Sequence, residues 1–187
     1  MRRIIIILLL SISIVSGSCE KVYQKSDNVD FYIFLDDSIS KDILKESYKI
    51  NKYLTRFDGY KEYGYAFYYE SSIGDCSYLI DCNSLGIKIY YADINKQGYA
   101  TAKKVGKTNY QILYFNPRYL NRHLYLHEFG HAIGNLKDLD RLKDKIDDKK
   151  TIMHYGSYTY HLSDWQIQDI KENIIESKKW CRINKYN

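Results

Sequence analysis

Two histidines and a glutamate in the segment HEFGHAIG have the types and spacing of residues that activate water at a metal ion. His127 and His131 are four residues apart, Glu128 follows the first histidine, and Gly134 ends the segment. Residues four apart lie on one face of a helix, so the two imidazoles can bind one metal ion. Glu128 can then reach a metal-bound water, and Gly134 can end the helix in a left-handed conformation. The segment therefore predicts a zinc-dependent hydrolase.

Capping signals frame two helices that would position this chemistry. Asn116 is a favoured N-cap and Pro117 suits the first helical position, which predicts a helix of about 17 residues ending at Ile133. Ser163 and Gln166 form the capping pattern S-x-x-Q of a last helix. This last helix has Ile167, Ile170 and Ile174 on its buried face, and Leu162 with Ile167 as a hydrophobic staple.

Short apolar and aromatic runs predict a sheet upstream of these helices. A helix of about 18 residues is expected after Asp36–Ser40, with Ile43, Ile50, Leu54 and Phe57 as its core stripe and Gly59 at its end. The order strand, helix, then several strands indicates an α+β domain. The expected strands are residues 31–35, 63–69, 86–92, 98–102 and 111–115.

The pattern His-Glu-x-x-His-x-x-Gly followed by a methionine resembles the metzincin metallopeptidases. Here the methionine is Met153, in the segment Thr151–Tyr155, and residues 162–170 are similar to the C-terminal helix of matrixin-type members. With the strand that begins at Gly98, the resemblance covers roughly residues 30–178. It implies a catalytic domain over 30–187. The implied zincin fold has a twisted, mostly parallel sheet with an antiparallel edge strand, packed on an active-site helix and a C-terminal helix.

The resemblance implies a zinc-dependent endopeptidase that cleaves extended polypeptides. Zn²⁺ would activate a water molecule, and Glu128 would act as the general base. Met153 would form an apolar floor beneath the metal, and Tyr155 matches a position that binds zinc or stabilises the transition state in some members. The substrate would add to the edge strand at 98–102 through its backbone.

The third zinc ligand departs from the family pattern. Metzincins place a histidine or aspartate three residues after the glycine, where this chain has Lys137, which has no lone pair to offer. We expect Asp138 to replace it, because one additional loop residue could turn its carboxylate inward. The alternatives are Asp140, His154 and His161. His123, one turn before His127, is expected to be a surface or supporting residue and not a ligand.

Two other interpretations stay open. Lys137 is compatible with a metzincin fold that binds peptides without catalysis or lacks zinc. A gluzincin-type peptidase would take its third ligand from Glu172 or Glu176 on the last helix, although it would need neither Gly134 nor Met153.

The N-terminus predicts export. Arg2 and Arg3 precede an apolar run that is too short to span a bilayer, and Ser16 to Ser18 offer a cleavage site, so residues 1–18 are expected to be a signal peptide. The segment from Ser16 to Cys19 resembles a lipobox. Cys19 is therefore expected to be the lipidated mature N-terminus of a bacterial envelope lipoprotein, with a short tether over 19–29. Ordinary cleavage after Ser18, which would give a secreted protein, is the alternative.

Charge and cysteine content limit the remaining partners. The 187-residue chain carries a net charge of +5 and has no basic cluster with interleaved aromatics, so we do not expect it to bind nucleic acid. We expect a monomer that contacts a membrane only through the lipid.

The cysteines after Cys19 are Cys76, Cys82 and Cys181. Export permits disulfides, and Cys76 could pair with Cys82 across a turn, with free thiols as the alternative.

Overall fold

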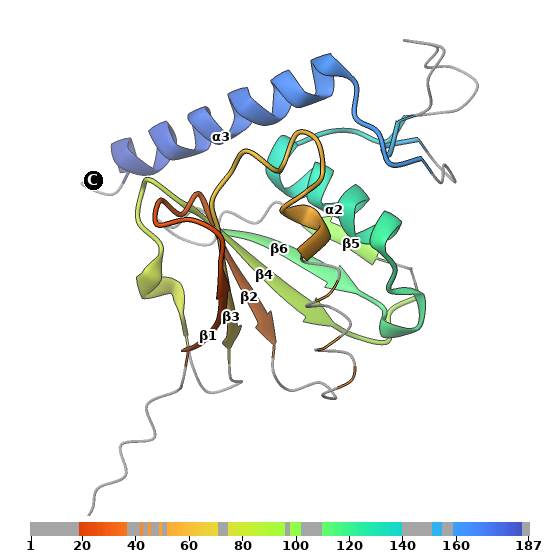
Figure 1. Cartoon of the computed structure of the whole chain (residues 1–187), viewed down its shortest axis with the longest axis horizontal. Coiled ribbons are helices and arrows are strands. Elements are labelled where there is room, and N and C mark those ends of the chain that lie inside the picture. The colour runs from red at the N-terminus through yellow and green to blue at the C-terminus, as the bar shows by residue number, and fades with distance from the viewer. Residues whose placement is uncertain are drawn as a thin grey trace, which may run out of the picture.

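A mixed, mostly parallel sheet is the centre of the fold (Figure 1). The structure, a computed structural model, describes residues 19–36, 42, 45, 49, 52–70, 75–95, 98–101, 110–139, 151–154 and 159–184. Within these ranges, six strands pair in the order β1-β3-β2-β4-β6-β5. They are β1 (Cys19–Gln24), β2 (Phe31–Asp36), β3 (Tyr65–Glu70), β4 (Leu85–Tyr91), β5 (Gly98–Thr101) and β6 (Tyr110–Phe115).

The pairing directions agree with the expected mostly parallel sheet. β2 is parallel to β3 and β4, and β4 is parallel to β6. β5 is antiparallel to β6, as predicted for one edge strand, and β1 is a second antiparallel edge strand beside β3. The five strands expected from the apolar runs all overlap observed strands. Of the helix predicted after Ser40, residues 42, 45, 49 and 52–54 are helical, and the rest of that prediction up to residue 51 lies outside the described residues. Residues 55–58 are turns and a bend, so the helix ends before the predicted end at Gly59.

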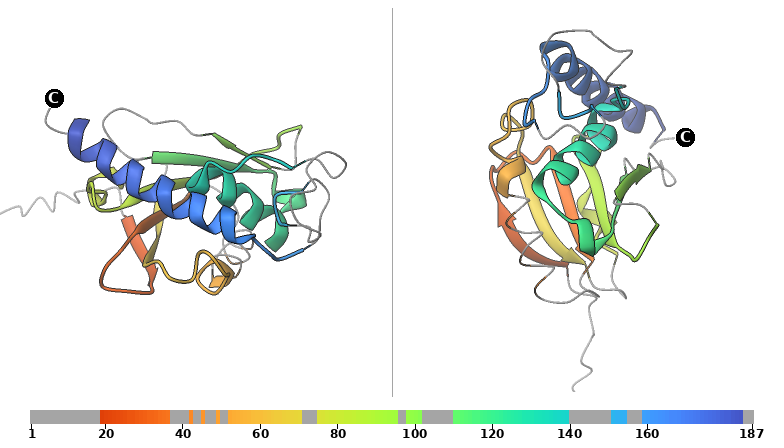
Figure 2. Two further views of the ribbon diagram at one scale, coloured as in Figure 1. Left: turned by 90° about the horizontal axis from the view of Figure 1, so that it is seen from above. Right: turned by 90° about the vertical axis from the view of Figure 1, so that its right-hand side faces the viewer.

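Two long helices complete the core: the first packs on one face of the sheet and the second packs mainly against the first (Figure 2). They are α2 (Arg122–Gly134) and α3 (Asp164–Asn184), and two short 3-10 helices, η1 (Ser77–Leu79) and η2 (Pro117–Tyr119), lie in loops. Ile33 and Leu113 of the sheet share one buried cluster with Phe129 of α2 and Ile170 of α3. Helix α2 is therefore packed between the sheet and α3.

The segment predicted as a tether over 19–29 begins with a strand. Residues 19–24 pair with β3 from Cys19 onward, so this part of the prediction is wrong. Its sequence, CEKVYQ, has no apolar run, because an edge strand exposes charged side chains such as Glu20 and Lys21 to solvent. None of the helices in the described ranges has the length and apolar character needed to cross a bilayer.

The disulfides differ from the expected pairing. Cys76 bonds to Cys19 and Cys82 bonds to Cys181, so the Cys76–Cys82 prediction is wrong. Each bond joins residues far apart in sequence, and such pairs come together only through the sheet and α3. Cys19 ties the edge strand β1 to the η1 loop, and Cys181 ties the last turns of α3 to the loop before β4.

Removing the second disulfide should destabilise the fold strongly. The Cys82→Ala/Cys181→Ala variant should lose about 2–5 kcal/mol of unfolding free energy, since the bond closes a long loop in the unfolded chain. The two cysteines are 99 residues apart. Urea denaturation measures the change, with the Cys19→Ala/Cys76→Ala variant, whose residues are 57 apart, as the comparison. An unchanged midpoint for Cys82→Ala/Cys181→Ala would contradict the pairing.

Candidate metal centre

Helix α2 holds His127, Glu128 and His131, but it begins later than predicted. The side chain of Asn116 accepts from the N–H of Arg118 and caps η2 alone. The chain then extends at Leu120, and Asn121 becomes the N-cap of α2 by accepting from the N–H of Leu124 at 2.9 Å. The predicted 17-residue helix is therefore two elements, because the backbone between them is not helical.

The C-terminal end of α2 turns at Asn135 and not at Gly134. Asn135 adopts the left-handed conformation, with φ of 49°, which asparagine tolerates better than most residues. Gly134 remains in the helix, where a Cβ would lie 2.6 Å from Cγ1 of Ile170 in α3. Gly134 is thus required for close packing of the two helices, and the predicted left-handed glycine is wrong.

Asn135 allows a direct test of this turn. Asn135→Ala should cost up to about 1 kcal/mol of unfolding free energy, because alanine keeps the Cβ that crowds the left-handed backbone and lacks the polar side chain through which asparagine compensates for it. Asn135→Gly should leave the stability unchanged or slightly higher. Thermal unfolding of the two variants side by side measures the difference, and equal losses would show that the left-handed turn does not matter.

The loop after Asn135 is fixed on both sides of Asp138. The N–H of Leu136 donates to the carbonyl of Gly130 at 3.2 Å, and the N–H of Leu139 donates to the carbonyl of Met153 at 2.9 Å. Both leucines are buried, whereas Lys137 is exposed. The carboxylate of Asp138, one residue beyond the position expected from the family pattern, is therefore turned toward the two histidines.

Three potential ligand atoms meet at one point. Nε2 of His127 and Nε2 of His131 are 3.2 Å apart, and Oδ1 of Asp138 lies 3.1 Å from the first and 3.2 Å from the second. A tetrahedral zinc ion with bonds of about 2.0–2.1 Å keeps its ligand atoms about 3.3 Å apart. The triangle of donor atoms thus has the dimensions that such an ion requires, and no other group of this kind occurs among the described residues.

The protonation of the two imidazoles favours a cation at this point. Nδ1 of His127 lies 2.9 Å from the carbonyl oxygen of Ile152, and Nδ1 of His131 lies 2.6 Å from that of Leu136. A carbonyl oxygen only accepts, so each Nδ1 atom carries the hydrogen, and the neutral form of each ring then presents an Nε2 lone pair. Two nitrogen lone pairs and the carboxylate of Asp138 then face one another, and a shared cation removes their repulsion.

The environment of His127 also favours its neutral form. Burial lowers the pKa of the His127 imidazole below its usual value, and His131 acts in the same direction, against the opposing effects of the Ile152 hydrogen bond and Asp138. A neutral imidazole is the form that binds a metal ion. The carbonyl partners at Nδ1 also fix the orientation of the rings, as hydrogen bonds to metal ligands commonly do.

The turn at residues 151–154 lies directly beneath the helix. Met153 is fully buried, and a Cβ on Gly130 would lie 2.6 Å from its sulfur. Met153 therefore packs against the turn of α2 between the two histidines, as the expected floor of the site would. Gln166 of α3 supports the turn, since its amide donates to Oγ1 of Thr151 at 3.2 Å while its carbonyl oxygen accepts from the N–H of Ser163 at 3.0 Å.

Sequence analysis did not identify these supporting groups. The capping pattern indicated Gln166 only as a cap of α3, and its second bond depends on the fold of the turn at 151–154. The carbonyls of Ile152 and Leu136 carry no sequence signal, because every residue has one.

The other candidate ligands that the structure describes do not join the group. Nδ1 of His154 accepts from the N–H of Thr151 at 2.9 Å, and His161 is exposed. Glu172 and Glu176 are exposed on α3. Asp140 and Tyr155 lie outside the described residues.

His123 and Glu128 lie next to the three ligand candidates on α2. The ring of His123 stacks on that of His127 with centroids 6.4 Å apart, and burial, followed by the nearby His127, lowers the pKa of His123. Glu128 is only 5 % exposed, in the helical turn between the two histidines. The low exposure of Glu128 keeps bulk water away from the carboxylate expected to act as a base.

Comparison with models of known protein families and with characterised proteins gives no match to this chain.

Proposed function

We propose that the chain is an exported, zinc-dependent endopeptidase of the metzincin type. The convergence of His127, His131 and Asp138, with both Nε2 lone pairs directed at one carboxylate, carries this proposal. The Met153 turn under the helix and the antiparallel edge strand β5 are further features that the resemblance implies. When bound, zinc supplies a Lewis acid that polarises the scissile carbonyl and acidifies water.

The residues of the chain have distinct roles in this proposal. His127, His131 and Asp138 would hold the metal, and the side chain of Asp138 is 37 % exposed to solvent. Glu128 accepts the proton of the attacking water and delivers it to the leaving amine. Met153 supports the histidines through Gly130. Tyr155 remains proposed for transition-state stabilisation.

The substrate binds as an additional strand. β5 is the last strand in the order of the described sheet and pairs with β6 on one side. An extended polypeptide can bond to the other side of β5 through its backbone, which gives affinity with little dependence on side chains. Polypeptides with unfolded or flexible segments are therefore the proposed substrates.

Proteolysis by the purified, oxidised protein tests the proposal. The chain should contain one zinc ion and cleave casein, a chelator should abolish the cleavage, and added zinc should restore it. A chain that binds zinc and peptides without cleaving them would instead be a non-catalytic binding protein. A chain that neither binds zinc nor cleaves casein would refute the proposal.

Export is part of the proposal, and the two disulfides support an oxidising compartment. The sulfur of Cys19 forms either the disulfide with Cys76 or a lipid thioether, and not both. The observed pairing favours the secreted form over the lipoprotein predicted from the lipobox-like segment. Membrane fractionation of the wild type and Cys19→Ala distinguishes the two, since only a lipoprotein would move from the membrane to the soluble fraction on substitution.

A further inference from the structure

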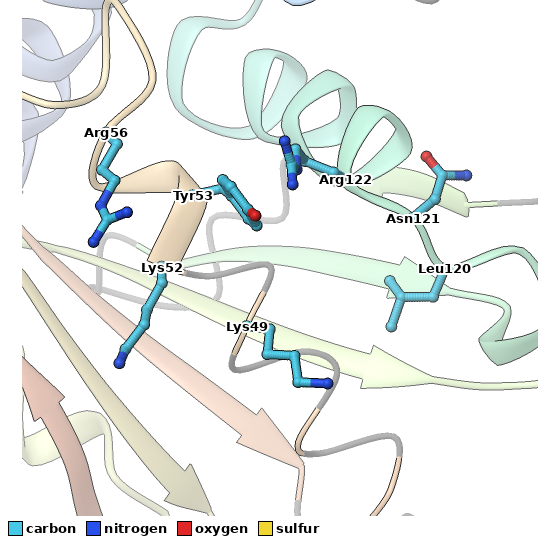
Figure 3. A pocket seen from close by; sticks show the side chains of 7 residues that line it. All are labelled: Lys49, Lys52, Tyr53, Arg56, Leu120, Asn121 and Arg122. Carbon is cyan, nitrogen blue, oxygen red and sulfur yellow. The ribbon is translucent and has the colours of Figure 1, made fainter.

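A pocket of about 490 Å³ lies next to the first turn of α2 (Figure 3), and its lining includes none of the three metal-ligand candidates. Four residues between 49 and 56 form one side of the pocket, and residues 120–122 form the other side. Its described lining contains four cationic side chains and no acidic one. The lining residues are Lys49, Lys52, Tyr53, Arg56, Leu120, Asn121 and Arg122.

The cations of the first segment form a row. Lys49, Lys52 and Arg56 are spaced three and four residues apart along the chain, and all are exposed. The row has its charged ends apart from one another, as Figure 3 shows. It is too long for one compact anion, and it matches several carboxylates spread along a chain.

The fourth cation is held in a fixed orientation. The guanidinium carbon of Arg122 lies 3.2 Å from the ring centroid of Tyr53 and 5.7 Å from that of Tyr160. Figure 3 shows Tyr53 and Arg122 facing each other from the two sides of the pocket. An arginine stacked in this way keeps its planar set of donors available for a carboxylate, at little further entropic cost.

We propose that this pocket binds an acidic segment of a polypeptide, through carboxylates on its cationic row and on Arg122. The proposal that this polypeptide is the substrate rests on the proposed function. Arg122 precedes His127 by five residues, or about 7.5 Å along α2. Five residues also turn the side chain about 140° around the helix, so this distance is a minimum. Since an extended chain advances about 3.3 Å per residue, the pocket would select acidic residues at least about three positions from the cleaved bond.

An acidic polypeptide fits better than a nucleic acid. The lining combines its charges with Leu120 and Tyr53, which can contact aliphatic side chains of a peptide. The net charge of +5 is modest, and a single pocket offers few contacts to a long phosphate backbone.

Peptide binding tests this inference without requiring catalysis. The full Glu128→Gln protein is titrated with a fluorescent Asp/Glu-rich peptide and with the matched Asn/Gln peptide. The acidic peptide should bind at least about tenfold more tightly, and its affinity should fall between about 50 and 300 mM salt, because salt screens charge pairs near a surface. Equal affinities for the two peptides would overturn the inference.

Charge-matched variants locate the binding. Lys52→Gln/Arg56→Gln should weaken binding of the acidic peptide about tenfold or more, and so should Arg122→Gln in an independent variant with wild-type circular dichroism. The control Lys21→Gln/Lys179→Gln removes the same charge from exposed residues of β1 and α3, and it should leave the affinity unchanged. Equal loss in the control, or tighter binding of duplex DNA than of the acidic peptide at this pocket, would overturn the inference.

The two proposals can fail separately. If the pocket variants lose peptide binding while the zinc-loaded wild type cleaves no polypeptide, the inference that the pocket binds acidic peptides is supported and the peptidase proposal is wrong. If casein is cleaved and the acidic peptide shows no preference, the peptidase stands and the pocket inference is wrong.

Discussion

Glu128→Gln should lower the turnover of casein about 10²–10⁴-fold, the usual contribution of a general base. The substitution keeps the size and hydrogen-bonding capacity of a side chain that is 5 % exposed on α2, so the fold should be retained. Glutamine cannot accept a proton from the attacking water, whereas the three ligand candidates are unchanged. Initial rates and zinc content measured on the same preparations give the result.

A matched change on α3 serves as the control. Glu172→Gln alters an exposed glutamate whose carboxylate accepts from the side chain of Gln168, and it should leave both turnover and zinc content unchanged. If Glu172→Gln lost zinc, the third ligand would come from α3, as in the gluzincin interpretation. If Glu128→Gln retained full turnover, Glu128 would not be the base.

Asp138→Ala should lower the zinc affinity by more than about a hundredfold, which exceeds the 10–100-fold typical of changes outside the ligand set. The substitution removes the oxygen that lies 3.1 and 3.2 Å from the two Nε2 atoms and leaves two imidazoles alone. Competition with a chromogenic chelator measures the affinity. Cleavage of casein at limiting zinc should fall in parallel.

Lys137→Ala is the control for this change. Lys137 is the adjacent exposed residue and stands at the position where the family pattern has its ligand. Its replacement should leave the zinc affinity within a few-fold of the wild type, since a surface cation near the site has only a weak, screened effect. A loss of affinity in Lys137→Ala equal to that in Asp138→Ala would contradict the assignment.

Local sequence patterns predicted the sheet well, because each of its central strands is a short apolar run. The run FYIFLD of β2 and the run QILYF within β6 are buried on the face that meets the helices, and they are recognisable without any tertiary information. β1 was missed because the segment CEKVYQ becomes a strand only by pairing with β3 and bonding to Cys76. The disulfides were missed for the same reason, since their partners meet only in three dimensions.

The candidate site shows the same division between local and tertiary information. The spacing of His127 and His131 places both on one helical face whatever surrounds the helix. The position of Asp138 depends on the left-handed turn at Asn135 and on the hydrogen bond from the N–H of Leu139 to the carbonyl of Met153. Leu139 and Met153 belong to two different segments of the chain. The sequence could therefore make Asp138 the preferred third ligand but left Asp140, His154 and His161 as alternatives.

The most direct test of the central claim is a crystal structure of the zinc-soaked protein with anomalous data collected at the zinc edge. The proposal predicts one strong anomalous peak at about 2.0–2.2 Å from Nε2 of His127, Nε2 of His131 and a carboxylate oxygen of Asp138, with a fourth position open to solvent. A peak elsewhere, or a peak on the two histidines with Asp138 turned away, would contradict it.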